Sequence, residues 1–128
     1  MRLTISTFIF LALAGGAAHA VERPTVVTLT DQPQVQQFSG VSTVGVSKSY
    51  TVKTSGSRKV TFHIEADNET CGAELRTDAE LGFMPEFRHF PTTRVEEADA
   101  GETFRISLFQ TRAARLKGTP CTFLLSIE

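Results

Sequence analysis

The sequence predicts an all-β protein, a small antiparallel β-sandwich of about seven to eight short strands with one disulfide. Three observations support this fold class. After residue 20, apolar and polar residues alternate with a period of two, and clusters of Gly, Pro, Ser, Asn and Asp separate the alternating runs. Only residues 111–117 have the period of a helix, over about two turns. Short strands without long helices favour one sandwich domain.

The N-terminal segment predicts export. Residues 1–20 contain one cation (Arg2), an apolar run over residues 8–14, and the sequence Ala-His-Ala at its end. These are the three parts of a secretory signal peptide. We therefore expect a signal peptide over residues 1–20 and a single domain over residues 21–128. The apolar run is too short to cross a bilayer, so no stable membrane insertion is expected.

Alternation of side chains predicts the strands. One clear run has Val60, Phe62 and Ile64 on one face and Thr61 and His63 on the other. Three further runs alternate as clearly, and three are weaker. Strong strands are expected at residues 50–53, 60–65, 104–108 and 121–127, and weaker ones at residues 26–30, 35–38 and 72–76.

The composition limits the possible partners. The chain of 128 residues is 41% hydrophobic and 21% charged, with a formal net charge of −1. Such values fit one globular domain and exclude collagen-like, disordered and multi-pass membrane classes. Since there is no excess of basic residues, no nucleic-acid partner is expected.

Two cysteines predict one structural disulfide. Export to an oxidising compartment makes Cys71–Cys121 the single available pairing. A loop of 50 residues gives this bridge a stabilising effect of up to about 4 kcal/mol in the chain-entropy model. A redox or metal-binding pair is disfavoured because the sequence has no Cys-x-x-Cys motif.

No catalytic constellation is recognisable, so the protein is not expected to be an enzyme and no metal or cofactor is expected. His63 lies on the polar face of a predicted strand, and His89 has no evident partner. The acidic run of residues 96–99 is either a weak cation site or, the favoured interpretation, a solvated turn before a strand. None of the motifs for nucleophilic hydrolases, zinc proteases, phosphate-binding loops or calcium loops is present.

The segment of residues 82–91 is unusually aromatic. It contains Phe83, Phe87 and Phe90 with Arg88 and two prolines, and it lacks strand alternation. Aromatic side chains with an Arg are typical of a contact surface, so these four residues form an alternative ligand-binding site. The other interpretation is a lid, with the rings folded back over one end of the sandwich.

A basic segment follows the strand at residues 104–108. Arg112, Arg115 and Lys117 place three cations within six residues of a net acidic chain. They are either a solvated connection or a site where Arg binds carboxylates in bidentate fashion.

The sequence around this segment resembles a known family. It resembles the C-terminal part of the periplasmic lysozyme inhibitors directed at goose-type and invertebrate-type lysozymes. The resemblance lies in the order Phe104, a strand, Gln110, Arg112 and then Arg115. The aromatic residue and the first Arg are eight positions apart, as in that family. Residues 37–40, 49–52 and 59–60 also resemble the family's early strands. The ending is similar, too, to β-sandwich domains that follow secreted bacterial peptidases.

The resemblance implies inhibition of a lysozyme by a loop that enters its active-site cleft. Carried over by position, the partner-binding residues are Ala100, Gly101, Glu102, Thr103 and Phe104, with Arg112 and Arg115. Ala100 and Phe104 stand where the family has Ser and Tyr, so both loop hydroxyls are missing.

Two hypotheses about function result. The first is a periplasmic or secreted inhibitor with a protein partner, a lysozyme. The alternative is a secreted binding module without inhibitory activity, which takes a glycan, peptidoglycan or protein ligand on the aromatic segment of residues 82–91.

Overall fold

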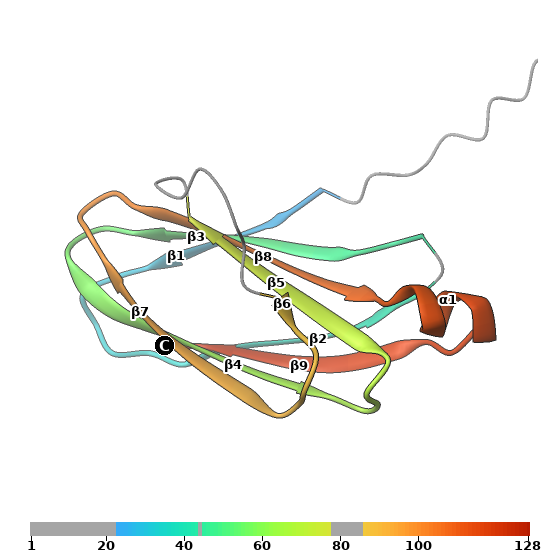
Figure 1. The fold of residues 1–128 in the computed structure, drawn as a ribbon. Helices are drawn as coiled ribbons and strands as arrows, with labels where there is room; N and C mark the ends of the chain where they lie inside the picture. The colour runs from blue at the N-terminus through green and yellow to red at the C-terminus, as the bar shows by residue number, and fades with distance from the viewer. Residues whose placement is uncertain (1–22, 44, 78–85) are drawn as a thin grey trace, which may run out of the picture.

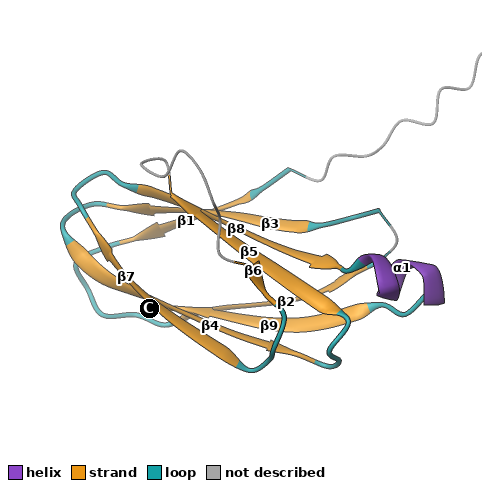
Figure 2. Ribbon diagram, viewed as in Figure 1, coloured by secondary structure: helices purple, strands orange, loops and turns teal. Residues whose placement is uncertain are grey.

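The computed structural model describes residues 23–43, 45–77 and 86–128. They form two β-sheets packed face to face, with one short helix at one end (Figures 1 and 2). The predicted all-β sandwich is confirmed. The predicted signal peptide and residues 78–85 lie outside the described residues, and no helix among the described residues is long and apolar enough to span a membrane.

Nine strands and one helix make up the described part of the chain. All seven predicted strands are present, most of them longer than expected. The elements are β1 (Thr25–Leu29), β2 (Gln36–Ser42), β3 (Lys48–Thr54), β4 (Arg58–Ala66), β5 (Cys71–Thr77), β6 (Glu86–Phe87), β7 (Thr92–Ala98), β8 (Thr103–Gln110), α1 (Arg112–Lys117) and β9 (Cys121–Ile127).

The two sheets have the strand orders β1-β3-β8-β5-β6 and β2-β9-β4-β7. Neighbouring strands are antiparallel except for β1 and β3, which pair in parallel. β8 and β9 each pair on both sides, and they are consecutive in the chain, joined through α1. Figure 1 shows α1 at the end of the sandwich where β8 leaves one sheet and β9 enters the other.

The core lies between the sheets and is built from one face of each long strand. In β8, Phe104, Ile106 and Leu108 are buried, while Arg105 is exposed. The ring of Phe104 meets that of Phe62 from β4 edge to face, with centroids 5.6 Å apart. Burial of a side chain of this size stabilises the fold by about 1.5–3 kcal/mol.

The predicted disulfide is confirmed. Cys71 begins β5 and Cys121 begins β9, so the bridge joins the two sheets. The two Cα atoms are 5.5 Å apart. Both cysteines are buried, which leaves the bridge in the interior rather than on a reactive surface.

The interpretation of residues 96–99 as a turn is wrong for most of that run. Residues 96–98 belong to β7, which lies at the edge of its sheet beside β4. Of this strand only Ala98 is buried, while Val95 is 54% exposed. Arg94 and Glu96 form an ion pair with an Nε–Oε1 distance of 2.5 Å. An edge strand that buries one residue has no apolar alternation for sequence analysis to detect.

The helix predicted at residues 111–117 is present as α1, and both ends are capped. The hydroxyl of Thr111 accepts a hydrogen bond from the Ala114 amide at 3.3 Å. Gly118 ends the helix with a φ of 67°, the left-handed conformation that glycine adopts without strain. Ala114 is the buried residue of α1, so the helix is fixed to the sandwich by one small side chain.

Candidate functional site

The α1 end of the sandwich carries a group of cations. Arg112, Arg115 and Lys117 are exposed, and none forms an ion pair with a described residue. Leu116, between them, is 78% exposed. An exposed leucine among unpaired cations is a surface suited to an acidic partner. We call these four residues the α1 cluster.

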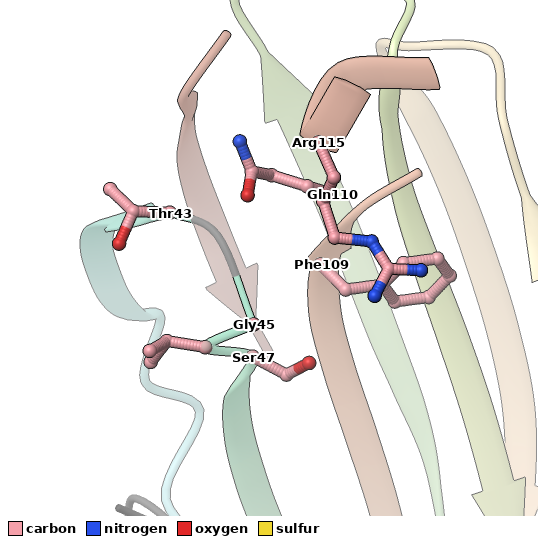
Figure 3. Close-up of a pocket in the computed structure, with 7 residues that line it drawn as sticks. Thr43, Gly45, Ser47, Phe109, Gln110 and Arg115 are labelled. Carbon is pink, nitrogen blue, oxygen red and sulfur yellow. The ribbon is translucent and has the colours of Figure 1, made fainter. Parts of the chain in front are cut away.

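A hollow of about 160 Å³ lies beside α1, between the loop that joins β2 to β3 and the end of β8. Figure 3 shows its residues drawn from three segments of the chain. It is lined by Thr43, Gly45, Val46, Ser47, Phe109, Gln110 and Arg115. Arg115 therefore belongs both to the α1 cluster and to this hollow.

Gln110 is the buried residue among those that line the hollow. It is 5% exposed, and its Nε2 donates a hydrogen bond to the Thr119 carbonyl. That contact fixes the orientation of the amide, because a flipped amide would place two acceptors together. The Oε1 atom is buried and has no partner among the described residues. In Figure 3, Oε1 lies on the side of the amide turned toward Gly45 and Ser47.

The opposite wall is formed by described residues of the connection between β2 and β3, which are Thr43 and residues 45–47. The buried Ser42 hydroxyl donates to the Val46 carbonyl at 2.5 Å, and the Val46 amide donates to the Thr43 carbonyl at 2.9 Å. Gly45 has a φ of 75°, which a residue with a side chain rarely adopts. These hydrogen bonds hold Val46 against Ser42 and Thr43, and the exposed residues Thr43 and Ser47 on either side of Val46 line the hollow.

Phe109 lines one side of the hollow. The position of its ring requires a glycine at residue 72 of the neighbouring strand. Gly72 of β5 lies opposite Phe109 of β8 in the sheet. A methyl group on residue 72 would lie 2.6 Å from Phe109 Cε2. The absence of a side chain at Gly72 therefore allows the ring to lie over β5.

Substitution Gly72→Ala is expected to push the Phe109 ring out of its place and to lower the free energy of unfolding by about 1–3 kcal/mol. Urea unfolding followed by circular dichroism measures this loss. The matched control is Ala73→Gly on the same strand, where a buried methyl is removed instead of added. Equal stability of Gly72→Ala and the wild type would show that the ring position does not depend on the glycine.

The turn carried over from the family resemblance lies at the other end of β8. Ala100 and Gly101 are exposed, in a tight turn closed by the Glu102 amide and the Asp99 carbonyl at 3.0 Å. Thr54 of β3 holds the turn, its amide donating to the Glu102 carbonyl at 3.4 Å. The eight residues of β8 separate this turn from Arg112 by roughly 26 Å at the usual rise per residue. Figure 1 shows the turn and α1 at opposite ends of the molecule.

The residues of that turn are therefore not brought together with Arg112 and Arg115. Phe104 is 0% exposed and belongs to the core, so its ring does not reach a partner in this conformation. Thr103 and Glu102 are half-buried. Within residues 100–104, Ala100 and Gly101 are the fully exposed residues, and neither carries a polar side chain.

The aromatic segment is partly covered. Phe87 and Phe90 are half-buried and pack against the core, as a lid would. Arg88 is exposed. Phe83 lies outside the described residues. As far as the structure describes this segment, two of its three rings face the protein.

The two histidines lie apart from the hollow. His63, on the outer face of β4, contacts Thr93 Oγ1 at 2.7 Å and Glu65 Oε1 at 3.2 Å and is exposed, as a cross-strand surface residue is. His89 is exposed beside Asp67 and Glu69, and no hydrogen bond joins it to a carboxylate within residues 23–43, 45–77 and 86–128. Those same residues contain no group of three His, Cys, Asp or Glu side chains placed to hold a metal ion.

Sequence reasoning missed Gln110, Phe109 and Ser47 as site residues. For Gln110 a signal was available, because it continues the inward series of Phe104, Ile106 and Leu108. A polar residue at an inward-facing position requires a hydrogen-bond partner, so Gln110 can be identified from the sequence as an unusual residue of the strand. Nothing in the local sequence brings Ser47 near it, since the loop and the end of β8 meet only through sheet pairing.

Comparisons with known proteins identify solved structures that have a similar fold. No protein-family model and no curated protein sequence matches the chain. Among solved structures, the pre-peptidase C-terminal domain of a collagenase from Bacillus anthracis matches with a TM-score of 0.63 and 10% identity, covering 84% of this chain and 96% of that one.

Periplasmic inhibitors of g-type lysozyme also match. The inhibitor PliG from Salmonella Typhimurium gives a TM-score of 0.58 at 15% identity, covering 83% of this chain and 98% of that one. PliG from Aeromonas hydrophila gives 0.57 at 13% identity, covering 83% and 96%. At such low identities the likeness shows the fold and no more. The chain thus has a β-sandwich fold similar to that of the g-type lysozyme inhibitors and of the pre-peptidase domain.

Proposed function

We propose that this protein is exported and inhibits an enzyme that degrades the cell wall, a lysozyme, by docking its α1 end on the enzyme's active-site cleft. The observation that carries the proposal is the group of unpaired cations at α1 on a fold similar to g-type lysozyme inhibitors. The predicted signal peptide and the buried disulfide support an oxidising compartment, the periplasm or the outside of the cell.

The charges of the side chains favour the α1 end over the turn of residues 99–102 as the surface that docks on the cleft. Glycoside hydrolases of this kind carry carboxylates in the cleft. Arg112 and Arg115 can donate paired hydrogen bonds to such groups. The turn instead carries Asp99 and Glu102, whose carboxylates would repel them.

In this proposal the protein acts by binding and not by catalysis. Blocking a cleft requires a rigid surface with satisfied polar contacts, and both caps of α1 provide rigidity. The aromatic segment is the less suitable surface, because Phe87 and Phe90 pack against the core.

The double variant Arg112→Ala/Arg115→Ala is expected to weaken inhibition by about 10- to 100-fold, because each Arg–carboxylate hydrogen bond contributes about 1.5–3 kcal/mol and part of this is screened at an exposed site. The measurement is the rate at which goose-type, invertebrate-type and chicken-type lysozymes lyse a peptidoglycan suspension at rising inhibitor concentration.

Two controls make this test specific. Arg105→Ala removes an exposed arginine from the outer face of β8 and should leave inhibition unchanged. Ala100→Arg places a bulky side chain at the opposite turn and should also leave it unchanged. Loss of inhibition in Ala100→Arg would move the docking surface to the turn, and failure of the wild type to slow any of the three enzymes would refute the proposal.

A further inference from the structure

The hollow beside α1 contains a hydrogen-bond acceptor that the protein leaves unused. Gln110 Oε1 is buried and unpartnered among the described residues, although its amide nitrogen is bound to Thr119. Buried acceptors in folded proteins nearly always have a donor. The Oε1 atom faces the part of the hollow bounded by Gly45 and Ser47 (Figure 3). A ligand in the hollow would therefore have to bring an N–H or O–H donor to this atom.

A second lining residue, Arg115, indicates that the ligand also carries a hydrogen-bond acceptor. Arg115 has donors only, is exposed and has no partner among the described residues, so it is available to donate to an oxygen acceptor on a ligand. A lone carboxylate would satisfy Arg115 but would place a further acceptor against Gln110 Oε1. One small group that offers an N–H donor and a carbonyl acceptor is a secondary amide, which in its trans form directs the two to opposite sides.

The remaining residues favour a sugar as the carrier of that amide. The ring of Phe109 offers an apolar face for a methyl group or a pyranose ring, as aromatic side chains do in sugar sites. The hydroxyls of Ser47 and Thr43 can both donate to and accept from sugar hydroxyls. The hollow of about 160 Å³ is similar to cavities of roughly 150 Å³ that bind benzene, so it takes a group of single-ring size rather than a folded loop.

We propose that this hollow binds an acetamido sugar, with the N–H of the acetamido group donating to Gln110 Oε1 and its carbonyl oxygen accepting from Arg115. Because Oε1 is buried in the free protein, side chains that line the hollow have to shift before the N–H of the sugar reaches it. The proposal concerns a ligand site of its own and does not rest on inhibition of a lysozyme.

The test is a titration of the purified ¹⁵N-labelled protein, followed by NMR, with two trisaccharides that share a β-1,4-linked glucose backbone. N,N′,N″-Triacetylchitotriose, called chitotriose below, carries an acetamido group on each sugar, and cellotriose carries a hydroxyl in its place. Chitotriose is expected to give saturable shifts at the Gln110 side-chain amide and at the Gly45 and Ser47 backbone amides. Cellotriose should bind at least about tenfold more weakly.

Substitutions locate the site. Arg115→Ala and Ser47→Ala change exposed side chains, so folding should be retained, and each should weaken chitotriose binding about fivefold or more. Arg105→Ala removes the same charge from the middle of β8, away from the hollow, and should bind as the wild type does.

Three results would overturn the proposal: no saturable shift with chitotriose, equal binding of the two trisaccharides, or shifts confined to residues away from the hollow. N-acetyl-alanine methylamide serves as a peptide probe, and if it bound as tightly as chitotriose the hollow would be a peptide-amide site instead. The titration contains no lysozyme, so its outcome is independent of the inhibition assay. Chitotriose binding by a protein that inhibits no lysozyme would sustain this inference and refute only the proposed function.

Discussion

Replacing Phe104 by alanine is expected to lower the free energy of unfolding by about 3–5 kcal/mol. The ring is fully buried and meets Phe62 edge to face across the two sheets. Its removal loses the transfer free energy of the ring and leaves a cavity that the rigid strands on both sides cannot fill. Urea unfolding at equilibrium measures the change as a lower midpoint with an unaltered slope.

The control for this prediction is Val95→Ala. Val95 is apolar but 54% exposed on the edge strand β7, so its truncation should change stability by no more than about 0.5 kcal/mol. The alternative expectation, from the family resemblance, is that the residue at this position contacts a partner. A Phe104→Ala protein that is as stable as the wild type but no longer inhibits a lysozyme would restore Phe104 to a binding surface.

Removing the disulfide is expected to cost a similar amount. The double variant Cys71→Ala/Cys121→Ala releases a loop of 50 residues, for which the chain-entropy model gives about 4 kcal/mol. Natural domains have a total stability of about 5–15 kcal/mol, so the variant retains the fold only by a small margin. The measurement is thermal unfolding of the variant and the wild type, each with and without a reductant.

The reductant provides the internal control. It should lower the melting temperature of the wild type toward that of the variant and leave the variant unchanged. A wild type whose melting temperature is insensitive to complete reduction would show that the link between β5 and β9 is not needed to hold the two sheets together.

Strands with one buried face were predictable because burial forces alternation. β4 and β8 have large apolar residues at every second position, and both were identified from the sequence. β7 was missed because an edge strand paired on one side needs few buried residues, and only Ala98 meets that condition. Pairing between strands far apart in the sequence, such as β1 with β3 in parallel, has no local signature at all.

The candidate site was predictable only in its local part. The cations of α1 are visible in the sequence, since their clustering needs no tertiary information. The turn of residues 100–104, which the family resemblance groups with Arg112 as partner-binding, lies at the other end of β8, because eight residues in β conformation extend a chain instead of returning it. The meeting of Ser47 with Gln110 follows from the pairing of β3 with β8, which the sequence does not specify.

β8 lies between β3 and β5, and β9 lies between β2 and β4. Because both strands are synthesised last, this arrangement affects how the chain folds during synthesis. Before β8 emerges from the ribosome, the strands already synthesised can form only pairs, β1 with β3, β4 with β7 and β5 with β6, while β2 has no partner. Isolated strand pairs are marginal in water. We therefore expect neither sheet to form before residues 103–127 have been synthesised. This C-terminal segment then supplies the two strands that complete both sheets.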